Sequence, residues 1–203
     1  MHLSTAYFAP IEWYAAFLAD ESPVIDIHEH YRKQTWRNRC RIVGPNGVQD
    51  LIVPVHLDGN HTPVKNVRID YSDRWQQRHW GAIRSAYGQS PFFEHFAPSF
   101  EVFFQTQEYT TLVELNTAIL ETILRLLRVK KNWNYSEEFL PYAERDLRLI
   151  LSPKHASRST QPPSYVQVFA ERHDFLPNLS ILDLLFCEGN AAAGYLAVYP
   201  RSA

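Results

Sequence analysis

The sequence has only two cysteines, Cys40 and Cys187. They lie far apart along the chain, so they form neither the close pairs of a zinc ribbon nor the framework of a disulfide-stabilised scaffold. This cysteine usage favours a reducing compartment, and we predict a cytoplasmic protein. Cys40 lies between two arginines, which favours a reactive thiolate, but a cysteine inside a predicted strand is more typical of packing.

Export and membrane signals are also missing. Residues 1–6 contain no basic region followed by a long apolar one, and Glu12, Asp20 and Glu21 come early, so we predict no signal peptide. No run of about 18 apolar residues is evident. We therefore predict no membrane insertion.

The chain lacks the G-x-G-x-x-G, Walker and G-x-S-x-G motifs, which removes the strongest arguments for a dinucleotide cofactor, an NTPase or an esterase. No cofactor is predicted. With 20 Lys and Arg against 22 Asp and Glu, the net charge gives little support for a nucleic-acid partner. The 45% hydrophobic content is typical of a globular protein, and we predict a single domain over residues 1–203.

Strand and helix periodicities follow one another near the N-terminus, which predicts an α/β fold with parallel pairing. The pair Asn46-Gly47 between two extended runs predicts a β-hairpin. The expected strands are Leu3–Phe8, Val24–Tyr31, Arg39–Val43, Val48–Val55 and Lys65–Tyr71.

Helices are expected mostly in the middle and C-terminal part of the chain, packed on a small mixed sheet from the N-terminal half. Thr111 and Glu114 form a capping-box sequence, and Gly189 is a helix stop. Residues 142–151 fit a helix or a strand, and residues 153–164 are expected to be a loop. The expected helices are one that begins at Pro10, one that Asp73 caps and that ends near Tyr87, and Phe92–Phe104, Leu112–Leu127 and Leu179–Phe186.

Five of the 20 Lys and Arg residues lie between Arg32 and Arg41. On a strand, Arg37, Arg39 and Arg41 would share one face, and such a row of guanidinium groups suits phosphate or carboxylate. We expect Lys33, Arg37 and Arg39 to hold an anion. Asn38 would point the opposite way, as a buried hydrogen-bonding group or a ligand contact. The competing interpretation is the solvated outer face of an edge strand.

The candidates for acid–base chemistry are His28, Glu29, His61 and His79. His79 falls on the apolar face of its predicted helix, where a histidine is more often a satisfied core residue. Asp26, His28 and His30 would share one strand face and, with His61 or His79, leave a metal site open as an alternative. No metal is predicted.

Several segments together resemble the WbqC-like family, bacterial proteins often encoded among genes for surface polysaccharide such as O-antigen. The resemblance covers nearly the whole chain. The first residues differ from the family pattern, because Leu3-Ser4-Thr5 stands where the family has His-Gln-Pro before a tyrosine. The tyrosine here is Tyr7, and we retain it as a candidate substrate contact. The segments that carry the resemblance are Lys33–Arg39, Leu51–Val55, Ile69–Trp75, His79-Trp80, Pro91–Phe93 and Asn178–Phe186.

The resemblance implies transfer of a glycyl or similar aminoacyl group to an amino sugar. On this hypothesis the substrate is a small anion such as a sugar nucleotide, Lys33, Arg37 and Arg39 hold its phosphate, and His28 or His61 deprotonates the sugar amine. Asn38 would orient the acceptor. The alternatives are a noncatalytic binding or assembly module with a basic docking surface, and a metal-dependent hydrolase. A homodimer is left open.

Overall fold

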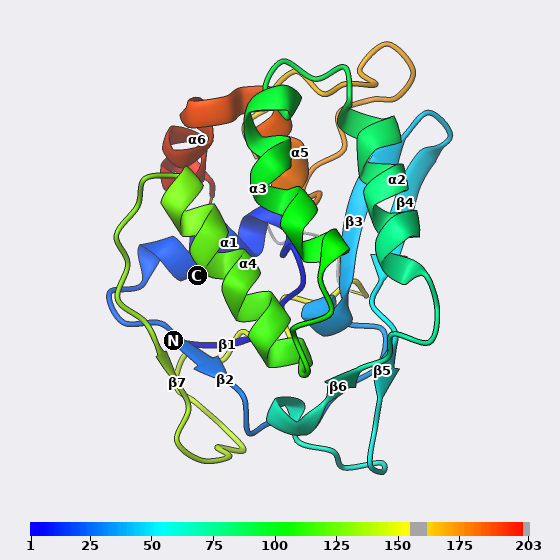
Figure 1. Ribbon diagram of the computed structural model, residues 1–203. Coiled ribbons are helices and arrows are strands. Elements are labelled where there is room, and N and C mark those ends of the chain that lie inside the picture. Colours follow the sequence, from blue (N-terminus) through cyan, green and yellow to red (C-terminus); the bar gives the residue numbers. More distant parts are fainter. Residues whose placement is uncertain (155–161, 201–203) are drawn as a thin grey trace.

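The computed structural model describes residues 1–154 and 162–200 (Figure 1). In these residues the strands form three small sheets rather than one mixed sheet. The first has the order β1-β2-β7, with β1 (His2–Ser4) parallel to β2 (Val24–Asp26) and β2 parallel to β7 (Asn134–Tyr135). Helix α1 (Ile11–Ala19) connects β1 to β2, so the predicted parallel strand–helix–strand unit is confirmed.

The prediction of a strand over Val24–Tyr31 is wrong beyond Asp26. The side chain of Asp26 accepts hydrogen bonds from the backbone N–H groups of His28 (2.9 Å) and Glu29 (3.0 Å). Such an Asx-type turn bends the backbone away from an extended path. Asp26, His28 and His30 therefore do not share the face of one strand.

The predicted hairpin is confirmed. Strand β3 (Arg39–Gly44) pairs antiparallel with β4 (Gly47–Ile52), and Arg39 lies opposite Ile52 at the open end. Gly47 has a φ of 105° at the turn, a conformation that glycine adopts without steric cost.

Beyond the hairpin, a third sheet pairs β5 (Val55–His56) with β6 (Arg68–Ile69). The strand predicted over Lys65–Tyr71 is thus much shorter, because Val64–Asn66 form a 3₁₀ turn.

Helices cover the sheets, as predicted (Figure 1). Thr111 caps α4 in the expected capping box with Glu114. The N-cap of α2 is Arg74 rather than the predicted Asp73, whose carboxylate instead pairs with Arg78. Gly189 follows the end of α5 with a φ of 57°. The helices after α1 are α2 (Trp75–Tyr87), α3 (Phe93–Gln105), α4 (Leu112–Leu126), α5 (Ile181–Glu188) and α6 (Ala192–Val198).

Helix α5 lies at the centre of the fold, with α1, α3, α6 and β3 against it. Its N-terminal turn is hydrogen-bonded to the first half of the chain. Ser180 donates from its N–H to the carbonyl of Arg41 and from its hydroxyl to the carbonyl of Phe8, both at 2.8 Å. The N–H of Ile11 donates to the carbonyl of Leu179 at 3.0 Å. One hydrophobic core includes residues from Leu3 to Tyr199, which supports the proposed single domain.

The helical stretch Ile181–Val198 bears on the expectation of no membrane insertion, although it is interrupted by polar residues such as Asp183 and Glu188. It has 18 residues and a mean hydropathy of 1.3, which is long and apolar enough to cross a membrane by length and composition. The stretch consists of α5, a 3₁₀ turn and α6, and 56% of it is buried inside the protein. A buried core helix explains its composition, which is compatible with the predicted lack of membrane insertion.

The region after β7 contains turns rather than the helix or strand expected over residues 142–151. Its contacts with the first sheet include an isolated bridge between Asp146 and His2 and an ion pair between Arg148 and Asp26. Part of the loop expected over residues 153–164 lies outside the described residues, since 155–161 are not described.

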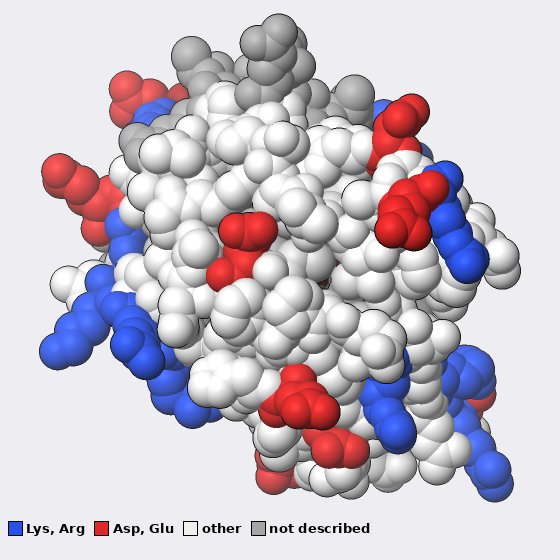
Figure 2. All heavy atoms as spheres, turned by 90° about the horizontal axis from the view of Figure 1, so that it is seen from above, with Lys and Arg blue, Asp and Glu red and all other residues white. Residues whose placement is uncertain are grey.

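Charged side chains are mixed in sign over the surface of the protein. Figure 2 shows one face on which acidic and basic groups lie mainly around the margin, with largely uncharged surface between them. Several Lys and Arg side chains lie next to one another at the lower left margin of this view, and acidic groups lie elsewhere on the same face.

Candidate functional site

The candidate site is a hollow at the open end of the β3–β4 hairpin, with a volume of about 430 Å³. Three segments build it: the loop between β2 and β3, the end of the hairpin, and β5. It is lined by Tyr31, Lys33, Gln34, Asn38, Arg39, Ile52, Val55, His56 and Leu57. We call this the basic hollow, because Lys33 and Arg39 line it and no acidic residue does.

The charge of Arg39 is only partly neutralised. Its Nη1 donates to Asp50 Oδ2 at 2.9 Å, but Arg41 also pairs with Asp50, at 2.8 Å from Arg41 Nε to Oδ1. Two guanidinium groups therefore share one carboxylate. The Nε of Arg39 is buried and has no hydrogen-bond partner among the described residues. An unpaired buried donor is costly, so the protein groups around Arg39 do not fully satisfy its guanidinium group.

The loop between β2 and β3 contributes an aromatic donor and an unusual backbone conformation. Burial raises the pKa of Tyr31 to about 12, although the charges of Arg37 and Arg39 oppose the rise, so its hydroxyl stays protonated and able to donate. Gln34 has a φ of 59°, which is uncommon for a residue other than glycine. Such conformations are often found at ligand sites.

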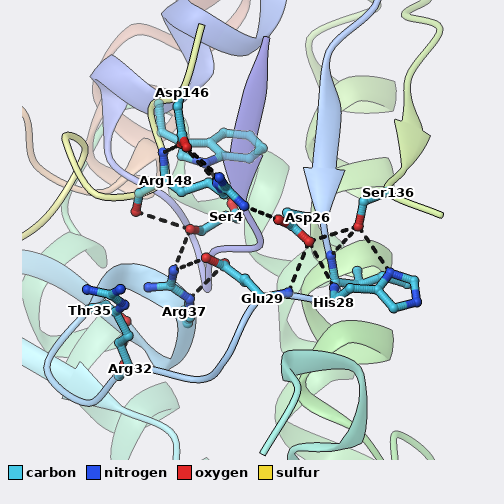
Figure 3. A network of polar contacts seen from close by, with 12 residues as sticks. Ser4, Asp26, His28, Glu29, Arg32, Thr35, Arg37, Ser136, Asp146 and Arg148 are labelled. Atoms are coloured by element: carbon cyan, nitrogen blue, oxygen red, sulfur yellow. Dashed lines mark hydrogen bonds and ion pairs between the residues drawn. The ribbon is translucent and has the colours of Figure 1, made fainter. Parts of the chain in front are cut away.

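A buried ion pair closes the base of this loop. Arg37 is 1% exposed and Glu29 is 5% exposed. Arg37 donates from Nε to Glu29 Oε1 at 2.9 Å and from Nη2 to Glu29 Oε2 at 2.5 Å, and Nη2 also donates to Ser4 Oγ at 2.7 Å (Figure 3). The expected row of arginines is wrong for Arg37, because Trp36–Asn38 form a 3₁₀ turn rather than a strand. Arg37 holds the loop, and Arg39 lines the basic hollow.

A second group of buried charges lies beside the first (Figure 3). Arg148 forms ion pairs with Asp26 and with Asp146, and Asp26 also accepts a hydrogen bond from Ser136 Oγ at 2.8 Å. The Nδ1 of His28 lies 3.2 Å from the same Ser136 oxygen. These contacts attach the turns after β7 to the end of β2, so Asp26 and His28 are held in a structural network outside the basic hollow.

Tyr7 and His79 meet in the core rather than in the basic hollow. The Tyr7 hydroxyl lies 3.0 Å from His79 Nδ1, and both residues are at most 5% exposed. Burial lowers the pKa of His79 to about 4, partly offset by a hydrogen bond to the backbone of Ile52. The histidine is therefore neutral near pH 7 and satisfied on both sides, as the apolar helix face suggested.

Of the predicted substrate contacts, the structure brings Lys33, Asn38 and Arg39 together in the basic hollow. The Nδ2 of Asn38 donates to the carbonyl of Val53 at 2.8 Å, which leaves its amide oxygen for another partner. His61 packs against His30, with ring centroids 5.1 Å apart, and is not among the residues of the hollow. The catalytic roles of His28, Glu29, His61 and His79 stay predictions, but none of the four lines the hollow.

The alternatives that involve Cys40 and a metal gain no support from the geometry. Burial raises the pKa of the Cys40 thiol, with a further contribution from Asp50, which disfavours the reactive thiolate. Among residues 1–154 and 162–200, no three His, Cys, Asp or Glu side chains are grouped so that they could hold a metal ion.

His56 was missed as a site residue. It lines the basic hollow from β5. The register of the predicted hairpin could have identified His56. Because Arg39 pairs with Ile52, the residues after Ile52 lie beside those before Arg39. Pro54 ends the hairpin strand and redirects the chain, so that Val55 and His56 form a wall.

The fold and the hollow together define an α/β protein with a hollow, lined by Lys33 and Arg39, at the open end of a β-hairpin. The chain belongs to the WbqC-like protein family, whose family model matches residues 6–161. It is 30% identical over 195 residues to the uncharacterized protein Rv1507c of Mycobacterium tuberculosis (strain ATCC 25618 / H37Rv), a match that covers 82% of this chain and 83% of that protein. No solved structure matches the chain.

Proposed function

We propose that the basic hollow binds the phosphate of a nucleotide-linked or lipid-linked amino sugar, and that the protein transfers an aminoacyl or acyl group to that sugar in the synthesis of surface polysaccharide such as O-antigen. The observation that carries the proposal is that Arg39, whose Nε has no hydrogen-bond partner among the described residues, lines the hollow together with Lys33, and that no acidic residue lines it. The volume of about 430 Å³ falls within the usual range for small-molecule sites.

Three polar residues of the basic hollow have a role in this proposal. Arg39 and Lys33 hold the phosphate, since an arginine fork and a lysine ammonium both bind phosphate strongly. The amide oxygen of Asn38 accepts a hydrogen bond from the acceptor sugar. The apolar side chains of Ile52, Val55 and Leu57 supply the contact surface that a sugar or its carrier needs.

Isothermal titration calorimetry with a panel of uridine and thymidine diphosphate amino sugars tests this proposal. Arg39→Ala removes a charged hydrogen bond and should weaken binding by about 2 kcal/mol, which corresponds to roughly thirtyfold in Kd. Arg41→Ala is the matched control, because Arg41 shares Asp50 with Arg39 but does not line the hollow. It should leave the affinity nearly unchanged.

Two results would reject the proposal. In one, no sugar nucleotide gives heat with the wild-type protein. In the other, a ligand binds but Arg39→Ala has the wild-type affinity and an intact fold by circular dichroism.

The noncatalytic module is the second candidate, because none of His28, His61 and His79 lines the hollow. In that function the basic hollow docks an acidic partner surface. Salt-sensitive binding of poly-glutamate, without any heat from sugar nucleotides, would favour it. The two functions thus differ in the ligand that the same residues bind, a sugar nucleotide in one and an acidic partner surface in the other.

A further inference from the structure

His56 is a titratable side chain of the basic hollow that forms no ion pair or hydrogen bond with another described residue. It is exposed, it lines the hollow together with Lys33 and Arg39, and its ring makes no hydrogen bond to another described residue. An imidazole ordinarily changes its charge between about pH 5 and pH 8. A protonated His56 would add a third positive charge to the hollow.

The charged groups around His56 keep the same charge state over this pH range. Arg68 lies opposite His56 in the register of β5 and β6, and it pairs with Asp58 at 2.8 Å. Hydrogen bonds from Ser72, with a smaller contribution from the charge of His56, lower the pKa of Asp70. Asp70 therefore stays ionised over this pH range.

The remaining lining groups also keep one charge state. Lys33 and Arg39 are cationic throughout this range, and burial raises the pKa of Tyr31 to about 12. Among the residues that line the hollow, His56 is the one with an imidazole side chain.

We propose that an anion in the basic hollow and a proton on His56 bind together, so that protonated His56 acts as a third anion-binding group beside Arg39 and Lys33. The inference rests on the anion site of the proposed function but not on the identity of the sugar. Because linkage is reciprocal, the bound anion favours protonation of His56 as much as protonation favours the anion. The hollow then selects a divalent anion such as a diphosphate diester over a monovalent one.

Sulfate is the probe, because its charge stays constant between about pH 6 and pH 8, so any change in affinity comes from the protein. Calorimetry with the wild-type protein should show sulfate binding roughly tenfold tighter at about pH 6 than at about pH 8, the gain expected for one added charged hydrogen bond. In NMR titrations, sulfate should move the titration midpoint of the His56 ring to higher pH.

His56→Asn should bind sulfate with equal affinity at both pH values, while retaining the affinity that the wild-type protein shows at the higher pH. The matched control is His95→Asn, which removes an exposed histidine of α3 outside the hollow and should keep the pH dependence of the wild type. Unfolding temperatures of both variants check that the fold is intact.

Three results would overturn the inference: no sulfate binding at either pH, equal wild-type affinity at both, or a pH dependence that survives in His56→Asn. The proposed function fails separately. Sulfate binding that depends on His56, combined with no binding of any sugar nucleotide, would reject the sugar substrate and keep the His56 linkage.

Discussion

Replacing Arg37 with methionine tests whether the buried ion pair with Glu29 holds the loop that forms one wall of the basic hollow. The change removes two hydrogen bonds to Glu29 and one to Ser4. Glu29, whose side chain is 7% exposed, would be left with a buried and uncompensated carboxylate. Breaking a buried pair in this way costs about 3 to 5 kcal/mol, a large part of the stability of a typical domain.

Urea denaturation followed by circular dichroism measures this cost. In thermal melts the same loss should lower the midpoint by roughly 10 °C for a chain of this size. Arg78→Met is the matched control, because Arg78 pairs with Asp73 at a side-chain exposure of 59%. It should change the unfolding curve little, since exposed ion pairs contribute little to stability.

A double-mutant cycle separates the ion pair from the lost packing. Glu29→Met combined with Arg37→Met leaves no unpaired charge. The double variant should therefore lose less unfolding free energy than the sum of the losses in the two single variants. If Arg37→Met behaves like Arg78→Met, or if the two single effects simply add, the buried pair does not hold the loop and the reasoning fails.

Three further variants address single contacts, and urea denaturation measures each. Asn38→Ala removes the hydrogen bond to the Val53 carbonyl and should cost about 1 to 3 kcal/mol. The wild type should lose at most roughly 3 kcal/mol of stability as pH falls from about 6.5 to about 4. In this range the unfolded chain binds a proton on His79, whereas the folded protein, in which the pKa of His79 is lowered, does not. His79→Gln should not show this loss. Gly189→Ala should cost about 2 kcal/mol, because the added Cβ would lie 2.5 Å from the Phe92 ring at a φ of 57°.

Each of these predictions has a clear contrary result. An Asn38→Ala variant of wild-type stability with weaker ligand binding would make Asn38 a ligand contact only. An unchanged acid profile in His79→Gln would show that other groups cause the loss at low pH. A neutral Gly189→Ala would mean that Phe92 moves aside freely.

Features whose signals are local could be predicted from the sequence. The capping box of Thr111 and Glu114 and the hairpin at Asn46-Gly47 depend on residues within a few positions of each other, and the structure shows both. The grouping of Lys33, Asn38 and Arg39 followed from the same hairpin, because these residues lie at its open end.

Features that depend on distant partners could not be predicted. The buried carboxylate of Asp26 forms an ion pair with Arg148, which lies far along the chain. Arg37 points inward because it pairs with Glu29 and donates a hydrogen bond to Ser4. The alternating pattern of the sequence had instead placed Arg37 on the face of a strand. Periodicity within one segment contains no information about which distant side chain will neutralise a buried charge.

The hydrogen bonds of Leu179 and Ser180 to Phe8, Ile11 and Arg41 have a consequence for synthesis on the ribosome. The first half of the chain emerges well before the central helix that it packs against, so the apolar surface that α5 covers has no native partner until α5 has been made. Contacts between segments so far apart also slow folding. We expect ribosome-stalled chains that stop before Leu179 to be digested readily by protease, and chains that include α5 and α6 to become resistant on release.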